Sequence, residues 1–185
     1  MKRSDLAHIL RAASTITSTP DIVIVGSQSI LGSFDEDDLP DEAVGSIEAD
    51  VAFLGVDAAK KALAVDGAIG EDSGFHQMYG YYAQGVEIDG LIVLPVGWQD
   101  RLVRGESLSS APGRALCLER HDLAVSKLAA FREKDLDFVH ALLRAGLLDP
   151  PVVLERLDLA DVPGPHARRL RAWVEAVTAR LQASG

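Results

Sequence analysis

The stretch that decides the fold reads Asp-Ile-Val-Ile-Val-Gly-Ser at residues 21–27. Its β-branched run after Pro20 predicts a buried strand, because such side chains fit the pleated surface of a sheet. The strand stops at Gly26 and Ser27, and residues 28–31 then predict the opening of a helix. Glycine allows an anion close to the backbone, and the first turn of a helix offers free N–H groups. The stretch therefore predicts an anion-binding turn or, since Gly-Ser ends many strands, a plain connection.

A second strand, expected at residues 47–54, carries Glu48 and Asp50 on one face, because side chains alternate along a strand. Two carboxylates this close repel each other unless a cation lies between them, and Mg²⁺ prefers oxygen ligands of this kind. By itself the pair favours an edge strand with a solvated acidic face. Combined with the Gly-Ser turn that precedes it, the pair predicts a magnesium site.

The rest of the chain predicts a small mixed sheet with flanking helices and a helical C-terminal third, an α/β (α+β) fold. We expect further strands at residues 81–88 and 91–94, joined by a tight turn at 89–90, and at residues 115–118. We expect helices at residues 4–13, 57–65, 122–145, 151–158 and 166–182, a surface loop at 33–45 and a glycine-rich loop up to residue 80. Two domains follow from this order: an α/β core over residues 1–121 and a helical region over residues 122–185 that packs on it.

Length and composition indicate a globular chain. It has 185 residues, of which 48% are hydrophobic and 25% charged, and its formal net charge is −10. Its one cysteine cannot form an internal disulfide, and its first residues do not resemble a secretory signal. No apolar run reaches the roughly 20 residues that span a bilayer. We therefore expect a cytoplasmic protein with no membrane partner.

Charge is unevenly distributed along the chain. Residues 35–50 hold eight acids and no base, whereas residues 101–134 hold seven bases against four acids. Because affinity for nucleic acid comes mostly from Lys and Arg, an acidic chain is a poor non-specific binder of it. The basic segment could still hold a triphosphate or one RNA end, and the balance leaves both open.

The helix expected at residues 122–145 has a carboxylate on its apolar face. At about 100° per residue, Asp135 lies in the middle of the apolar stripe, with Arg132 inside its wider half and Lys127 on its edge. A buried lone carboxylate is costly, so Asp135 needs a partner, and Arg132 at i−3 is the simplest one. The pair either tethers the helix or borders a cleft, where Arg132 or Lys127 contacts phosphate and Asp135 orients them or takes a proton. Because Lys127 lies on the same side, we favour the cleft.

Three further patterns have two interpretations each. The aromatic residues around 75–79 fit a base-stacking pocket or, as we prefer, a cluster of core rings. His121 and Asp122 fit a base with its orienting acid, although Asp122 fits a helix N-cap better. The basic residues in 164–171 open a helix whose charged face is either solvated, as we prefer, or in contact with RNA.

Several motifs together resemble a known family. They are found at residues 25–32, 48–50, 80–85, 94–98, 118–127 and 132–135. With them the chain resembles small nucleotidyltransferase-like proteins related to toxin nucleotidyltransferases of the AbiEii and MenT type, in the polymerase-β-like superfamily. The resemblance covers roughly residues 20–146 and does not extend to the last part of the chain.

The resemblance implies an enzyme, a nucleotidyltransferase that uses Mg²⁺ to move a nucleotide from a nucleoside triphosphate to a hydroxyl group. The acceptor that it implies is RNA, such as a tRNA end, in a toxin–antitoxin setting with a cognate antitoxin protein as partner. The alternative is a non-catalytic module that binds a nucleotide or a partner protein on the same fold.

The resemblance also implies a set of site residues. Glu48 and Asp50 hold the metal, Gly26, Ser27, Lys127 and Arg132 bind the nucleotide, and Glu48, Asp50, Lys127 and Asp135 serve the chemistry. Two departures from the family pattern bear on this set. The gap between Ser27 and Glu48 is longer than in the best-known members, and a third metal carboxylate is not obvious, with Glu87 and Asp89 the nearest candidates. Loss of that third ligand would leave binding without turnover.

Overall fold

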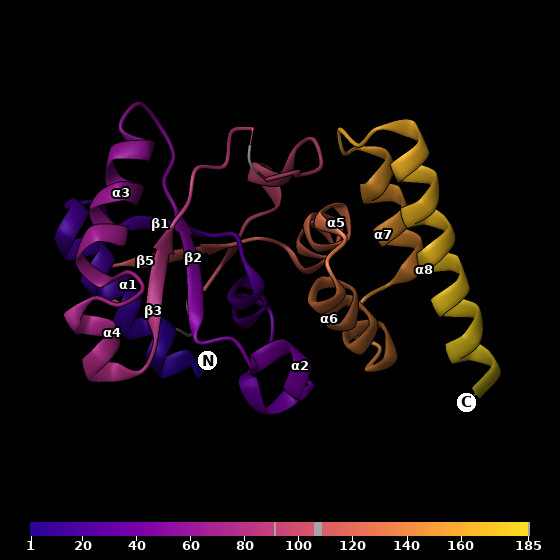
Figure 1. Ribbon diagram of the computed structural model, residues 1–185, viewed down its shortest axis with the longest axis horizontal. Helices are drawn as coiled ribbons and strands as arrows, with labels where there is room; N and C mark the ends of the chain where they lie inside the picture. Colours follow the sequence, from indigo (N-terminus) through magenta and orange to yellow (C-terminus); the bar gives the residue numbers. More distant parts are fainter. Residues whose placement is uncertain (91, 106–108, 185) are drawn as a thin grey trace.

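A five-stranded sheet with helices on both sides forms the centre of the protein (Figure 1). The computed structural model describes residues 1–90, 92–105 and 109–184, the side chain of residue 184 excepted. The strands are β1 (Asp21–Ile24), β2 (Glu48–Ala52), β3 (Tyr82–Gly85), β4 (Val103–Arg104) and β5 (Arg114–Cys117). This architecture confirms the mixed α/β fold expected from the sequence.

Helices surround this sheet. The α-helices are α1 (Arg3–Thr17), α2 (Asp41–Val44), α3 (Ala58–Ile69), α4 (Gly74–Tyr79), α5 (Arg120–Ala130), α6 (Glu133–Arg144), α7 (Pro150–Asp158) and α8 (Gly164–Ser184). Short 3₁₀ helices η1 (Ser27–Gly32), η2 (Glu36–Asp38) and η3 (Trp98–Arg101) lie in the connections. In Figure 1, α1, α3 and α4 lie on one side of the sheet and α5 and α6 on the other, with α7 and α8 outermost. None of the helices in the described ranges has both the length and the apolar character needed to cross a membrane.

The strand order β3-β2-β1-β5-β4 mixes parallel and antiparallel pairs. β1 runs parallel to β5 and antiparallel to β2, and β2 runs parallel to β3. A parallel pair needs a crossover, which α3 and α4 supply between β2 and β3. The predicted hairpin of residues 81–88 and 91–94 is therefore wrong. β3 ends at Gly85 and pairs with β2, residues 92–94 form no strand, and residue 91 lies outside the described residues.

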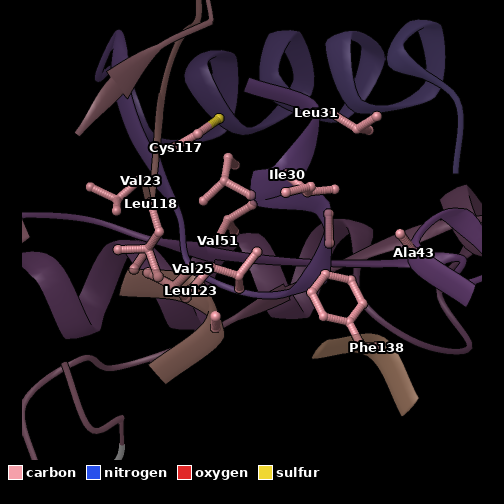
Figure 2. Packing of buried hydrophobic residues seen from close by; sticks show 14 of the residues in the cluster. Val23, Val25, Ile30, Leu31, Ala43, Val51, Cys117, Leu118, Leu123 and Phe138 are labelled. Atoms are coloured by element: carbon pink, nitrogen blue, oxygen red, sulfur yellow. The ribbon is translucent and has the colours of Figure 1, made fainter. Parts of the chain in front are cut away.

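The segment that follows β1 closes the core. Residues 28–31 of η1 are all buried, and Ile30 and Leu31 belong to the same apolar cluster as Val51 and Phe138 (Figure 2). The predicted helix after Gly26 is thus a tight 3₁₀ helix that packs inward. It brings buried side chains from one end of the sheet toward the helices α5 and α6.

The acidic segment at residues 33–45 is more ordered than the surface loop that we predicted. It forms η2 and α2, and it buries Leu39 and Ala43 as anchors among its exposed acids. α2 packs against α6, where Glu42 pairs with Arg144 at 3.1 Å. In the same way, the predicted glycine-rich loop before residue 80 contains α4.

The single helix predicted at residues 122–145 is two helices. α5 ends at Phe131, whose φ of 54° is left-handed, and α6 begins after Arg132. An L-residue in this conformation interrupts a right-handed helix. The continuous apolar stripe that we expected is therefore wrong, and α5 and α6 each bury an apolar face of their own. The domain boundary after residue 121 stays a prediction.

Asp122 is buried in an ion-pair network and is not a helix N-cap, so that expectation is wrong. The N-cap of α5 is Glu119, whose side chain accepts a hydrogen bond from the main-chain N–H of His121. Asp122 accepts hydrogen bonds from Nε and Nη2 of Arg101 at 2.8 and 3.1 Å, and Nε of Arg156 lies 3.4 Å from its Oδ1. The network ties η3 and α7 to the start of α5.

Candidate functional site

Gly26 and Asp50 are in direct contact at the end of β1. A Cβ atom placed on Gly26 would lie 1.6 Å from Oδ2 of Asp50, which is far inside van der Waals contact. The main-chain N–H of Val25 donates to the carbonyl oxygen of Asp50 at 3.1 Å and holds the two segments together. The sequence left this turn open between an anion-binding site and a plain connection. In the structure the carboxylate of Asp50 approaches Gly26, and a side chain at position 26 would displace it.

Glu48 and Asp50 lie on the same face of β2, as strand alternation predicts, whereas Ala49 and Val51 are buried on the other face. Burial raises the pKa of the Asp50 carboxyl above its ordinary value, although nearby cations oppose the rise. Burial and the charge of Asp50 raise the pKa of Glu48 as well. Because a cation between the two carboxylates would offset both effects, the pair fits the role of metal ligands.

The neighbouring strand β3 presents Tyr82 and Gln84 to this face. The register pairs Glu48 with Tyr82 and Asp50 with Gln84, and side chains of paired residues point to the same side. The side chains of Tyr82 and Glu48 lie close enough to influence each other's pKa. The position beside Asp50 is therefore occupied by a neutral amide.

Asp135 holds two cations next to this face. Its carboxylate accepts hydrogen bonds from Nε and Nη2 of Arg132 at 2.6 and 3.3 Å, and Nζ of Lys127 lies 3.4 Å from its Oδ1. The side chain of Asp135 is only 1% exposed. Both cations also act on the charge of Asp50, which places this cluster beside the carboxylates of β2. The predicted pairing of Asp135 with Arg132 is confirmed, and Lys127 joins it because α5 and α6 meet at Phe131.

A pocket of about 590 Å³ lies where these groups meet. Its polar lining consists of Gly26, Asp50, Asp66, Gln84, Glu87, Ser126, Lys127 and Arg132. Its apolar wall comes from α3 and from the segment after β3: Ala59, Ala62, Leu63, Val86, Ile92 and Val93. A pocket of this size that combines charged groups with apolar side chains suits a small polar ligand with a flat apolar part.

The structure brings together some of the predicted site residues and leaves others at the edge. Ser27, Glu48 and Asp135 do not line the pocket: Glu48 lies beside Asp50 toward Tyr82, and Asp135 reaches the pocket only through its two cations. Of the candidates for a third carboxylate, Glu87 lines the pocket and Asp89 does not. Within the described ranges of the chain, no three His, Cys, Asp or Glu side chains form a metal-binding group.

Sequence reasoning missed Gln84 and the apolar wall from α3. Gln84 reaches the site through the parallel register of β2 and β3, and α3 reaches it by packing across β3. The main chain of α3 comes so close to β3 that a Cβ atom on Gly85 would lie 1.9 Å from the carbonyl oxygen of Ala62. Local pattern carries no signal for either contact, because both depend on the crossover.

Two of the weaker sequence patterns, the aromatic residues around 75–79 and the pair His121 and Asp122, lie away from the pocket. Phe75, Tyr79 and Tyr81 form an aromatic cluster with His8, whose Nδ1 lies 2.8 Å from the hydroxyl of Tyr81. None of these aromatic residues lines the pocket. His121 is buried, with Nδ1 2.7 Å from Glu119 and Nε2 accepting from a main-chain N–H of α7's N-cap at 3.1 Å. These contacts support structural roles for both groups.

Comparison with known proteins identifies the family. No curated protein and no solved structure matches the chain significantly. A protein-family model described as "Nucleotidyltransferase of unknown function (DUF6036)" matches residues 4–174, from the second residue of α1 to about the middle of α8. With this match over nearly all of its length, the chain belongs to that family of nucleotidyltransferases.

Proposed function

We propose that the protein is a Mg²⁺-dependent nucleotidyltransferase that moves a nucleotide from a nucleoside triphosphate to a hydroxyl group of RNA. Membership of the family supports the general reaction. One observation supports the site: Asp50, packed against Gly26, lines one pocket together with the cations of Lys127 and Arg132, which act on its charge. This arrangement offers negative charge to a metal ion and positive charge to the phosphates that accompany it.

Glu48 and Asp50 are the residues that would hold Mg²⁺ in this proposal. They fit the ion because their mutual repulsion falls when it binds, and Mg²⁺ commonly takes its remaining oxygen ligands from water and from substrate phosphates. When bound, the ion would neutralise charge on the triphosphate. The apolar wall from α3 would receive the base and sugar.

Lys127 and Arg132 contact phosphate oxygens and stabilise the charge that develops there in the transition state. Asp135 is a positioning residue, because its carboxylate already accepts hydrogen bonds from Arg132 and pairs with Lys127. In the transfer, the acceptor oxygen forms a bond to the α-phosphorus. The bond that breaks joins the α-phosphorus to the oxygen that bridges the α- and β-phosphates. Pyrophosphate leaves, and the hydroxyl proton passes to water.

RNA as acceptor, the toxin–antitoxin setting with an antitoxin partner and the cytoplasmic location rest on the resemblance to the AbiEii and MenT type. The basic start of α8 lies beside the site and agrees with an RNA acceptor. The guanidinium of Arg169 lies 4.0 Å from the centre of the Phe131 ring, and Nε2 of His166 lies 3.0 Å from the carbonyl oxygen of Ala129, a residue of the pocket wall.

The test is transfer of label from each of the four α-³²P triphosphates, with Mg²⁺ and total RNA. We expect label in RNA, and we expect Asp50→Asn to abolish both transfer and Mg²⁺-dependent triphosphate binding without loss of the fold. Asp37→Asn, at an exposed acid of η2, is the matched control and should retain both. Label in protein would contradict the RNA acceptor. If the magnesium dependence of triphosphate binding is unchanged in Asp50→Asn, the assignment of Asp50 as a metal ligand is wrong.

A non-catalytic nucleotide-binding module is the second candidate, and the neutral Gln84 beside Asp50 favours it. A chain with fewer charged ligands can hold a nucleotide with its ion and transfer it poorly. In the same assay, tight triphosphate binding with no label in RNA or protein would support this candidate over the enzyme.

A further inference from the structure

We infer that this pocket takes one divalent cation, not two, and that Gln84 sets this number. The inference rests on the proposed function and concerns the ion of that same site. It deepens that proposal by naming the residue that limits the occupancy of the site.

Gln84 occupies the place on β3 from which a third ligand would reach the ion. Its Cα is the register partner of Asp50, and both residues line the pocket. Ala83, the residue before it, is buried on the opposite face. Tyr82, two residues back on the same face, is the register partner of Glu48 and not of Asp50. Of the β3 side chains, Gln84 is thus the one placed next to Asp50 in the pocket.

Two divalent cations need more negative charge than this site provides. In two-metal sites the ions lie roughly 3.5–4 Å apart, so their repulsion has to be offset by anionic ligands that they share. The carboxylates of Glu48 and Asp50 bring two negative charges, and the amide of Gln84 brings an oxygen without charge. Asp66 and Glu87 also line the pocket, but in the described part of the chain no three acidic, His or Cys side chains come together as a metal group.

The two cations of the pocket disfavour a second ion further. Lys127 and Arg132 both line the pocket and both act on the charge of Asp50. A second divalent ion in this pocket would be repelled by the first ion and by these side chains. One ion with Lys127 and Arg132 already supplies the positive charge that a triphosphate needs.

The experiment counts bound Mn²⁺ by electron paramagnetic resonance titration of the whole chain, with a non-hydrolysable triphosphate present. We expect one Mn²⁺ per chain in the wild type. Gln84→Glu should bind a second Mn²⁺ at least tenfold more tightly than the wild type does, because it adds a carboxylate beside Asp50. Gln99→Glu in η3 makes the same change at an exposed position outside the pocket and should leave the count at one.

Gln84 is exposed, and thermal denaturation checks that Gln84→Glu is folded. Gln84→Asp, with a shorter carboxylate, provides a second variant for the same count. Two Mn²⁺ in the wild type, or one in both Gln84 variants, would overturn the inference while leaving the proposed function intact. No Mn²⁺ in the wild type at any triphosphate concentration would overturn the proposed function itself, and the inference with it.

Discussion

Two buried aspartates, Asp135 and Asp122, have nearly the same local structure and serve different parts of the molecule. Each is at most 1% exposed, and each accepts two hydrogen bonds from one arginine. Each also has a second cation at 3.4 Å. Around Asp122 the partners come from η3 and α7, so the network joins elements of the scaffold. Around Asp135 they come from the end of α5 and the start of α6, at the edge of the pocket.

The difference lies in how far the cations are exposed. The two arginines around Asp122 have side chains that are 21% and 20% exposed, so their charge is largely committed to that carboxylate. Arg132 at Asp135 is 58% exposed, and with Lys127 it also acts on Asp50. Lys127 is only 15% exposed, so Arg132 is the accessible cation at Asp135. A buried carboxylate that leaves one cation accessible can orient it toward a ligand. One with two mostly buried cations can only tether the fold.

The largest expected effect is on stability. Asp122→Ala strands two mostly buried arginines and should lower the free energy of unfolding by about 3–5 kcal/mol. Asp135→Ala should lower it by only roughly 1–3 kcal/mol, because water can solvate the exposed Arg132. Urea denaturation measures both values. Equal losses would show that the exposure of Arg132 does not distinguish the two sites.

A second test replaces the aspartate and its arginine together at each of the two sites. Arg132→Leu/Asp135→Leu should keep the fold and weaken triphosphate binding by roughly 10- to 100-fold, because the charged hydrogen bonds to phosphate are lost. Arg101→Leu/Asp122→Leu should leave triphosphate affinity unchanged, whatever it does to stability. Isothermal titration calorimetry with a non-hydrolysable triphosphate measures the affinities. If the Arg132→Leu/Asp135→Leu variant binds the triphosphate with unchanged affinity, the pair has a purely structural role.

Two glycines provide a smaller test of the same division between site and scaffold. A Cβ atom on Gly26 meets the Asp50 carboxylate, whereas a Cβ atom on Gly32 would lie 2.5 and 2.7 Å from Cβ and Sγ of Cys117. We expect Gly26→Ala to weaken triphosphate affinity about tenfold and to cost little stability, because Asp50 can turn aside. Gly32→Ala should cost about 1–3 kcal/mol of stability by overpacking and keep the affinity of the folded fraction. Calorimetry measures the triphosphate affinity of both variants, and urea denaturation measures their stability. Comparable losses of affinity and stability in Gly26→Ala would show that Gly26 is part of the scaffold.

The smallest expected effect separates the core thiol from the site. Burial raises the pKa of Cys117 from 9.0 to about 12. The folded state therefore retains the thiol proton where the unfolded state loses it, so this contribution is complete below pH 9.0 and is lost as the pH rises toward about 12. In that window the free energy of unfolding should fall by up to about 1.4 kcal/mol per pH unit more steeply in the wild type than in Cys117→Ala. Parallel slopes in the two proteins would contradict the burial of the thiol.

Much of the site could be predicted from single elements of the sequence. Strand alternation placed Glu48 and Asp50 on one face, and the need of a buried carboxylate for a partner identified Arg132 beside Asp135. These inferences depend only on the period of a strand and on the cost of an unpaired charge. The break at Phe131 was missed, because a left-handed residue leaves little trace in hydrophobic periodicity.

The sequence by itself determined the mixed α/β fold, the buried strand that ends at Gly26 and the paired carboxylates of β2, because each follows from local periodicity and side-chain chemistry. The tertiary structure alone decided that β3 pairs in parallel with β2 and so brings Gln84 to Asp50. It also decided that the space above Gly26 belongs to the Asp50 carboxylate. These contacts join residues far apart in the chain, and the packing of α3 and α5 around the sheet determines them, which no local pattern records.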